Sequence, residues 1–410
     1  MEKSITRPTV GVICEFNPLH NGHVYLLSQA RALVGETGCV ICVMSGASTQ
    51  RGELAIADPY LRGKTAIFSG ADLVAALPFP WCSGSAETFA QAGVHILREL
   101  GVKHLIFGSE CGDLSLLSTA ATLTEQEIFS EVYAKLCTQG RGTAAAYAEA
   151  LQQLARMQGM NLPDGFPSSN DLLGIAYLAA IKDTDMIPHT VKRMGQAYND
   201  EILHDSQFPS ATSLRLLMQE AKEDSLSLSV MLNGCMPPSC LDALLADIEH
   251  GKVPVMSQKL LPFYHAYFRL LRLKEGHTST AELSGGIDRH LHKVALQAAT
   301  ADEFWKKIQT KQYTEARLRR GMLYALTGVT TEDICSMPTY TLLLAANTKG
   351  RAYLSAHRKS EGFPVVTKPA DAPPSRQREL SEAIDALFTL CMPQPAESGY
   401  LTKQSPYIEK

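Results

Sequence analysis

Near its amino end the chain carries the sequence Gly11-Val-Ile-Cys-Glu-Phe-Asn-Pro-Leu-His-Asn-Gly-His23. The apolar run from Val10 to Phe16 predicts a buried parallel strand, which Asn17-Pro18 ends. The residues from Val24 to Ala30 predict a helix. His20 and His23 therefore fall at the start of that helix, about one turn apart and on the same face.

Such a helix start is suited to binding a phosphate group. Unpaired backbone N–H groups and the positive end of the helix dipole point outward there, and two imidazoles add directional donors. Gly22, which has no Cβ, lets a ligand approach the backbone. A lone histidine is more often a helix cap or a core residue. That interpretation explains poorly why Asn-Pro-x-His-x-Gly-His follows a buried strand, so we interpret the turn as a nucleotide-phosphate site.

The turn also resembles a known signature. Asn17-Pro18-Leu19-His20-Asn21-Gly22-His23 is similar to the HxGH signature of the nucleotidyltransferase superfamily, whose members join ATP to an acceptor and release pyrophosphate. Further segments resemble, in order, the bacterial tRNA(Met) cytidine acetate ligase family, and the resemblance covers nearly the whole chain. These segments are Met44–Gly46, Gln50–Glu53, Ala71–Val74, Phe107–Glu110, Asn170–Gly174, Lys192-Arg193, Ser210–Arg215, Lys311–Arg317 and Lys349–Leu354.

The resemblance implies a set of site residues. His20 and His23 would be catalytic. ATP contacts would come from the HxGH turn and its flanks and from four positions further along. The residues implied for ATP are Ile13, Cys14, Glu15, Phe16, Asn17, Pro18, Leu19, His20, Asn21, Gly22, His23, Val24, Tyr25, Leu26, Gly108, Asn170, Arg193 and Ser213. The candidates for substrate or phosphate contact are Ser45, Gln50, Arg51 and Lys64.

Four further strands are predicted, namely Cys39–Met44, which is a second apolar run, Ala71–Leu77, Val102–Phe107 and Asp185–Arg193. Helices are predicted at Ala86–Glu99, across residues 115–159 and at Leu172–Ile181, and we expect Asn170-Asp171 to cap the last of these. Asp72 is expected to hold a neighbouring loop rather than a metal ion. In an open α/β sheet, ligands gather at the carboxyl ends of the strands, so Ser45, Gly108 and Arg193 should lie beside the HxGH turn.

A second helix start is predicted at Ser210-Ala211-Thr212-Ser213-Leu214-Arg215, where small hydroxyl residues could receive phosphate. In the superfamily a Ser/Thr-rich segment followed by Arg closes over the triphosphate. Ala211 departs from the double serine often found there, which leaves open whether Ser210 or Ser213 makes the contact.

We predict an α/β fold with a Rossmann-like parallel sheet, the nucleotidyltransferase domain at residues 5–225, followed by a mostly α-helical domain at residues 226–410. Helical spacing in this second part predicts Cys240–Glu249, Leu260–Leu273, Asp288–Ala299, Ala301–Gln309, Thr314–Thr327 and Tyr340–Ala346, with a short strand at Phe363–Lys368. Its basic residues stand near Trp305 and Tyr313, as an RNA-tracking surface requires, although a solvated helix face explains the charges equally well. The candidates for tRNA contact are Lys306, Lys307, Lys311, Arg317 and Arg320.

Bulk composition narrows the class of protein. The net charge of −4 over 410 residues argues against wholesale electrostatic binding of nucleic acid, so RNA would need a local basic face. We expect a cytosolic protein because no secretory signal opens the sequence and no apolar run is long enough to span a bilayer. The ten cysteines are interpreted as reduced thiols. Cys39 and Cys42 have C-x-x-C spacing within a predicted strand, and we predict no structural zinc and no metal site.

The residues support adenylyl transfer with ATP as substrate and Mg²⁺ as its expected companion, without a dedicated protein cage for the ion. They do not name the acceptor or the oligomeric state. The resemblance implies that acetate attacks ATP to give acetyl-adenylate, and that N4 of the wobble cytidine of elongator tRNA(Met) then takes the acetyl group. Two alternatives stay open: a nucleotidyltransferase for a small metabolite, and a non-catalytic ATP- or RNA-binding protein.

Overall fold

The computed structural model describes residues 7–139, 142–193, 209–220, 225–271, 280–310, 313–357 and 362–409. Within these residues, eight strands form one mixed sheet in the order β5-β4-β1-β2-β3-β6-β7, and β8 also pairs with β6. All the pairings are parallel except that of β3 with β6. The strands are β1 (Thr9–Cys14), β2 (Cys39–Ser45), β3 (Leu73–Leu77), β4 (His104–Ser109), β5 (Ile187–Lys192), β6 (Thr341–Ala346), β7 (Val365–Val366) and β8 (Tyr407–Ile408).

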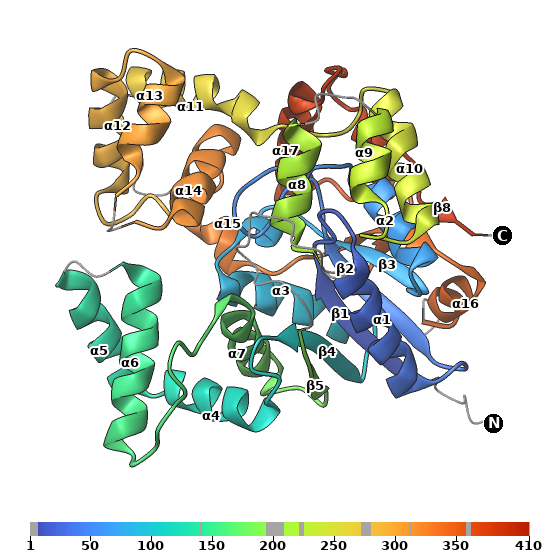
Figure 1. Ribbon diagram of the computed structural model, residues 1–410, viewed down its shortest axis with the longest axis horizontal. Coiled ribbons are helices and arrows are strands. Elements are labelled where there is room, and N and C mark those ends of the chain that lie inside the picture. Colours follow the sequence, from blue (N-terminus) through green and yellow to red (C-terminus); the bar gives the residue numbers. More distant parts are fainter. Residues whose placement is uncertain are drawn as a thin grey trace.

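Helices make up most of the remaining chain and cover both faces of the sheet (Figure 1). The first ten are α1 (Asn21–Val34), α2 (Pro59–Phe68), α3 (Ala86–Glu99), α4 (Leu114–Thr124), α5 (Glu127–Thr138), α6 (Thr143–Met157), α7 (Ser169–Ile181), α8 (Ala211–Glu220), α9 (Ser225–Leu232) and α10 (Pro238–Glu249). The others are α11 (Leu261–Leu270), α12 (Ile287–Gln297), α13 (Ala301–Ile308), α14 (Glu315–Thr327), α15 (Thr331–Cys335), α16 (Thr348–His357) and α17 (Arg376–Cys391).

The sheet is buried on both faces, which is why its central strands are continuous apolar runs. Every residue of β1, β2 and β3 is buried. Alternate side chains point to opposite faces. Val10 and Val12 pack in one apolar cluster with α1, α2, α8 and α10, whereas Ile13 packs in the other with α3 and α7. The predicted strands and the mostly parallel sheet are therefore confirmed.

The same alternation separates the two cysteines of the C-x-x-C spacing. Cys39 lies in the cluster with α3 and Cys42 in the cluster with α1, on opposite faces of the sheet. Residues three apart in a strand point in opposite directions, so these two thiols cannot bind one metal ion together.

One predicted helix is wrong. Residues Thr341–Ala346 form β6, which lies antiparallel to β3. The Leu- and Ala-rich composition favours a helix locally, but pairing with β3 satisfies the backbone, and the Thr341 hydroxyl donates to the Ala76 carbonyl at 2.6 Å. The chain after residue 226 thus adds three strands to the sheet that begins with β1. The division into domains at residues 225 and 226 stays a prediction.

Asp72 holds neighbouring elements at the amino end of β3, as expected. Its carboxylate forms an ion pair with Arg31 of α1 and accepts from the Val40 amide at 2.8 Å. The other carboxylate oxygen accepts from the Asn347 side chain, also at 2.8 Å. Asp72 therefore joins α1, β2 and the segment after β6.

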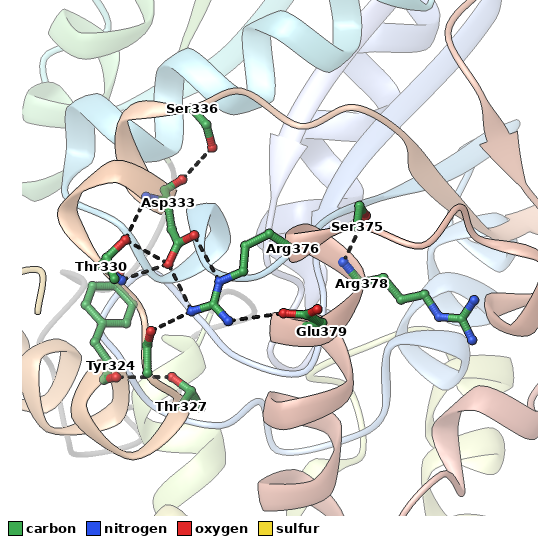
Figure 2. Close-up of polar contacts among 10 residues, drawn as sticks. Tyr324, Thr327, Thr330, Asp333, Ser336, Ser375, Arg376, Arg378 and Glu379 are labelled. Carbon is green, nitrogen blue, oxygen red and sulfur yellow. Dashed lines mark hydrogen bonds and ion pairs between the residues drawn. The ribbon is translucent and has the colours of Figure 1, made fainter.

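Figure 2 shows how the end of α14 and the short helix α15 are fixed to α17. Arg376 donates from Nε to the Asp333 carboxylate at 3.1 Å and from Nη2 to the Gly328 carbonyl at 2.6 Å. Asp333 also accepts from the Thr330 amide at 2.8 Å. Burial opposes ionisation of Asp333, but the hydrogen bonds from Arg376 and Thr330 prevail and lower its pKa. This network fixes the end of α14 and the short helix α15 against α17.

Among the described residues, no helix combines the length and the apolar character that crossing a bilayer requires.

Candidate functional site

The HxGH turn connects β1 to α1 and orients two imidazoles. His20 caps α1, and its Nδ1 accepts from the Gly22 amide at 3.1 Å. The Nδ1 of His23 accepts from the His20 amide at 3.3 Å, and the two ring centroids lie 3.8 Å apart. Because both Nδ1 atoms accept, the proton of each neutral ring is on Nε2. The turn thus presents two Nε2–H donors. The prediction of unpaired backbone N–H groups at the helix start is wrong, because those of Asn21, Gly22, His23 and Val24 all donate within the protein.

Both histidines are held neutral. Burial, followed by the nearby charges of Arg193 and Arg215, lowers the pKa of His20 to about 3. Burial, His20 and Arg193 lower the pKa of His23 well below its usual range. At neutral pH the imidazoles therefore donate hydrogen bonds without adding positive charge, and the nearby positive charge comes from the arginines.

Gly22 is required by the packing of the turn. A Cβ at this position would lie 2.9 Å from Cε1 and 3.1 Å from Nδ1 of the His20 ring. The glycine therefore allows the imidazole to fold back onto the backbone and cap the helix start.

The strand order places this turn where a nucleotide is expected. From β1 the chain proceeds outward through β2 and β3, whereas β4 and β5 lie on the other side of β1. The carboxyl ends of β1 and β4 thus form a topological switch point, where ligands of open α/β sheets bind. The sequence-predicted Gly108 lies at the end of β4, and a Cβ there would meet Cγ of Arg193 at 3.3 Å.

Glu110 gathers the residues predicted at this edge. Its carboxylate accepts from the Asn170 side chain at 2.6 Å and from the Asn170 amide at 3.0 Å, and it lies 4.0 Å from Nε of Arg193. The structure corrects the expected cap of α7, because the cap residue is Ser168 and Asp171 closes the capping box. Asn170 lies in the first turn of the helix, facing Glu110. Three predicted ATP residues, Gly108, Asn170 and Arg193, therefore lie together.

The loop after β2 approaches the turn from the other side. Ser45, at the end of β2, is fully buried, and its hydroxyl has no hydrogen-bond partner among the described residues. The Gln50 amide donates to the Glu15 carboxylate at 2.7 Å. Burial raises the pKa of Glu15, against the opposing effects of the Gln50 N–H and of Arg215, Arg62 and Arg51. Predicted residues Ser45, Gln50 and Arg51 thus surround the end of β1.

Arg62 is a residue that the sequence interpretation missed. Its guanidinium is buried and donates to the carbonyls of Ala57 at 3.0 Å, of Glu15 at 2.7 Å and of Gly46. It joins the carboxyl ends of β1 and β2 to the loop before α2. Its spacing four residues after Asp58, which caps α2, is the signal that could have identified it.

Lys64, the predicted candidate for substrate or phosphate contact on the same helix, lies beside two aromatic rings. Its ammonium lies 5.6 Å from the ring centroids of both Phe68 and Tyr407. Residues two apart on a helix point in nearly opposite directions, so Arg62 and Lys64 cannot face the same site. Tyr407 pairs with Ala345, which in turn pairs with Val74 near the amino end of β3. Lys64 therefore lies at the opposite end of the strands from the HxGH turn.

Arg215 of helix α8 contacts the HxGH turn. The guanidinium of Arg215 donates to the Asn17 carbonyl at 2.9 Å, within the HxGH turn. Ser210 and Ser213 are both buried, and the Ser213 hydroxyl donates to the Ser210 carbonyl at 2.8 Å. Which serine contacts phosphate stays a prediction.

The predicted basic surface divides into two parts. Lys306 and Lys307 are exposed on α13, and Lys307 lies 2.6 Å from Glu303. Arg317 and Arg320 instead pair with Glu282, at 3.2 and 2.8 Å, and Arg320 is buried. Lys311 lies outside the described residues. A role of these five residues in tRNA contact stays a prediction, with the exposed lysines as the accessible members.

The predicted ATP residues within and beside the HxGH turn differ in their exposure. Ile13, Cys14, Phe16, Asn17, Pro18 and Leu19 are buried and shape the turn, whereas Glu15, Asn21, Val24, Tyr25 and Leu26 are partly exposed. Asn17 accepts from the Ile56 amide at 2.7 Å, and Asn21 donates to the Gly234 carbonyl at 2.7 Å. Taken together, these donors and arginines can bind an anionic polyphosphate at the helix start.

Comparison with known proteins shows what the chain resembles. A model of the HIGH Nucleotidyl Transferase family matches residues 8–402. The tRNA(Met) cytidine acetate ligase of Acetivibrio thermocellus is 34% identical over 94% of this chain and 96% of its own length. That of Bacillus licheniformis is 33% identical over 88% of this chain and 86% of its length.

Two solved structures are similar to this chain over nearly its whole length. A crystal structure of Thermotoga maritima TmcAL without ligand has a TM-score of 0.88 and 28% identity, covering 98% of this chain and 99% of the other. A second crystal structure of that protein, bound with alpha-thio ATP, has a TM-score of 0.84 and 27% identity, with the same coverage.

Proposed function

Because the chain belongs to the tRNA(Met) cytidine acetate ligase family, we propose that it activates acetate with ATP and transfers the acetyl group to N4 of the wobble cytidine of elongator tRNA(Met). The relatives are named for this activity, and one similar structure holds an ATP analogue. The observation that carries the proposal is the pair of neutral histidines, His20 and His23, whose Nε2–H donors stand at the start of α1.

In the first step an acetate oxygen attacks the α-phosphorus of ATP. The bond from that phosphorus to the bridging oxygen breaks, and pyrophosphate leaves with the electron pair. The Nε2–H groups of His20 and His23 and the guanidinium of Arg193 would stabilise the charge that develops on the phosphate oxygens. Positioning and charge stabilisation suffice for this step, so no residue of the chain needs to become a covalent nucleophile.

In the second step N4 of the cytidine attacks the acetyl carbon of acetyl-adenylate. The bond from that carbon to the phosphate oxygen breaks, AMP leaves, and N4 gives up one proton. The base must leave its stack to reach the adenylate. With tRNA as its substrate, we expect the protein to act in the cytoplasm. The exposed Lys306 and Lys307 are proposed to contact the phosphate backbone of the tRNA.

We expect Mg²⁺ to arrive bound to ATP rather than to a site of the protein. Among the described residues, no group of three or more His, Cys, Asp or Glu side chains could hold a metal ion. Polyphosphate oxygens and water are ligands that Mg²⁺ accepts readily, and the ion would neutralise the charge of the leaving pyrophosphate.

The proposal is tested by measuring pyrophosphate release from ATP with and without acetate. Wild-type protein should release pyrophosphate only with acetate. Replacing His23 with Ala should lower the rate by about 10²–10³ because it removes one oriented donor. His250→Gln, a change at an exposed histidine at the end of α10, is the matched control and should leave the rate unchanged. Acetate-independent release would instead favour a nucleotidyltransferase for another metabolite.

A further inference from the structure

A cavity of about 370 Å³ lies between the loop after β2, helix α8 and helix α14. Figure 1 shows α14 beside α8. We call it the Glu53 cavity and define it by Arg51 and Glu53 of the loop, Arg215 and Gln219 of α8, and Glu315 and Arg319 of α14. Its volume is within the range of sites that enclose a small molecule.

The Glu53 cavity adjoins the HxGH turn. Arg215 lines the cavity and also donates to the Asn17 carbonyl at 2.9 Å. The positive charge of the same arginine helps to lower the pKa of His20. One side chain therefore contacts both the proposed ATP site and the cavity, so a molecule in the cavity would lie next to the reacting phosphate.

Close packing fixes the carboxylate of Glu53 in the wall. Gly52 has a φ of +76°, and a Cβ there would lie 2.5 Å from the Arg320 amide nitrogen, so the loop touches the backbone of α14. Arg319 lies 3.2 Å from Glu53 and 2.5 Å from Glu315, and its guanidinium is 4.4 Å from the ring centroid of Trp305. Arg319 is therefore held between two carboxylates and an aromatic ring, and it positions Glu53.

The walls present both hydrogen-bond donors and acceptors. Guanidinium and amide groups come from Arg51, Arg215 and Gln219, and carboxylates come from Glu53 and Glu315. Acetate and polyphosphate offer only acceptors, so they could pair with the guanidinium groups but with neither carboxylate. Cytosine offers acceptors at O2 and N3 and a donor at the exocyclic amino group, and a carboxylate is an established partner of that amino group.

We propose that the Glu53 cavity holds the acceptor cytosine after it leaves its stack, with Glu53 accepting a hydrogen bond from its exocyclic amino group. This inference rests on the proposed function and adds the residues that recognise the base. A carboxylate has about four lone-pair positions, so the ion pair with Arg319 leaves capacity for the amino group. Because the amino group is also the nucleophile, Glu53 would orient it beside the acetyl-adenylate.

The test compares Glu53→Gln with wild type on two transcripts that differ only in C or U at the acceptor position. Glutamine can accept from cytosine or donate to O4 of uracil, whereas glutamate only accepts. Glu53→Gln should keep acetate-dependent pyrophosphate release, lower the rate of RNA acetylation about tenfold, and lower the ratio of C to U affinity by about the same factor. Glu382→Gln, on α17, is the matched control, because this glutamate is ion-paired with Arg378 outside the cavity and the change should leave both measurements unaltered.

A second variant removes space rather than a hydrogen bond. Gln219→Trp would fill the Glu53 cavity from α8 and should abolish RNA acetylation but not pyrophosphate release. Glu220→Trp, at the exposed neighbouring position, is its control. An unchanged ratio of C to U affinity in Glu53→Gln, or normal acetylation by Gln219→Trp, overturns the inference. Absence of acetate-dependent pyrophosphate release from the wild type would instead overturn the proposed function.

Discussion

Arg62→Met should be among the most destabilising single changes near the site. The buried guanidinium donates to three backbone carbonyls, those of Ala57, Glu15 and Gly46. Burial lowers the pKa of Arg62 to about 10, which leaves it charged at neutral pH. Methionine fills a similar volume but donates no hydrogen bond, so three buried acceptors lose their partner.

The magnitude follows from those three acceptors. A buried acceptor left without its partner costs about 1–3 kcal/mol, so the three carbonyls would cost about 3–9 kcal/mol if none of them found another donor. We expect Arg62→Met to lower the free energy of unfolding by about 3–5 kcal/mol. That loss is a large part of the about 5–15 kcal/mol by which proteins are usually stable.

Urea unfolding followed by circular dichroism measures this loss. The matched control is Lys64→Met on the same helix, where the ammonium lies over Phe68 and Tyr407 and the loss should stay below about 1 kcal/mol. Equal losses in the two variants, or a loss below about 1 kcal/mol in Arg62→Met, would refute the view that Arg62 fixes the strand ends.

Three other outcomes are expected. The pKa of His20 is lowered to about 3 in the folded protein. Below about pH 6.5 the unfolded chain therefore binds a proton that the folded chain does not, so the free energy of unfolding decreases as the pH decreases. His20→Gln should therefore lose about 2 kcal/mol less than wild type in urea unfolding between pH 7 and pH 5, and an equal loss would contradict the neutral ring. The pKa of Asp333 is lower in the folded protein than in the unfolded chain. Its pairing with Arg376 therefore stabilises the fold at pH values above the unfolded pKa, and this stabilisation is lost as the pH decreases through the folded pKa. In thermal unfolding, Arg376→Ala should cost about 1 kcal/mol more at pH 7 than at a pH where the Asp333 carboxyl is protonated, whereas loss of the hydrogen bond to the Gly328 carbonyl costs the same at both. A cost that does not change with pH would exclude the pairing with Asp333 as the cause. Replacing both Lys306 and Lys307 with Ala should weaken tRNA binding and reduce the slope of log K against log salt by about 1–2, and an unchanged slope would remove them from the RNA surface.

The core of the fold could be predicted because its strands are continuous apolar runs between clear breaks. β1 to β4 are such runs, and parallel strands buried on both faces require them. β6 could not be predicted, since its Leu- and Ala-rich sequence favours a helix and only the distant partner β3 makes it a strand. Local sequence carries no information about such a pairing.

The candidate site was predictable where one short segment contains the chemistry. His20, Gly22 and His23 share a single turn, so their spacing alone indicated a phosphate site. Arg62 was missed because its role depends on which face of α2 meets the strand ends. Arg320 was predicted at the RNA surface, but Glu282, far away in the sequence, pairs with it at 2.8 Å. Long-range ion pairs of this kind have no local signature.

The most direct test of the proposed function is to follow the acetyl group itself. Purified protein would be incubated with ATP, Mg²⁺, deuterated acetate and an elongator tRNA(Met) transcript, and the RNA nucleosides would be analysed by mass spectrometry. We predict N4-acetylcytidine carrying the deuterated methyl group, at the wobble position and dependent on ATP. Unmodified RNA in a reaction that still releases pyrophosphate from ATP would contradict transfer to tRNA and would reassign the chain to a different acceptor.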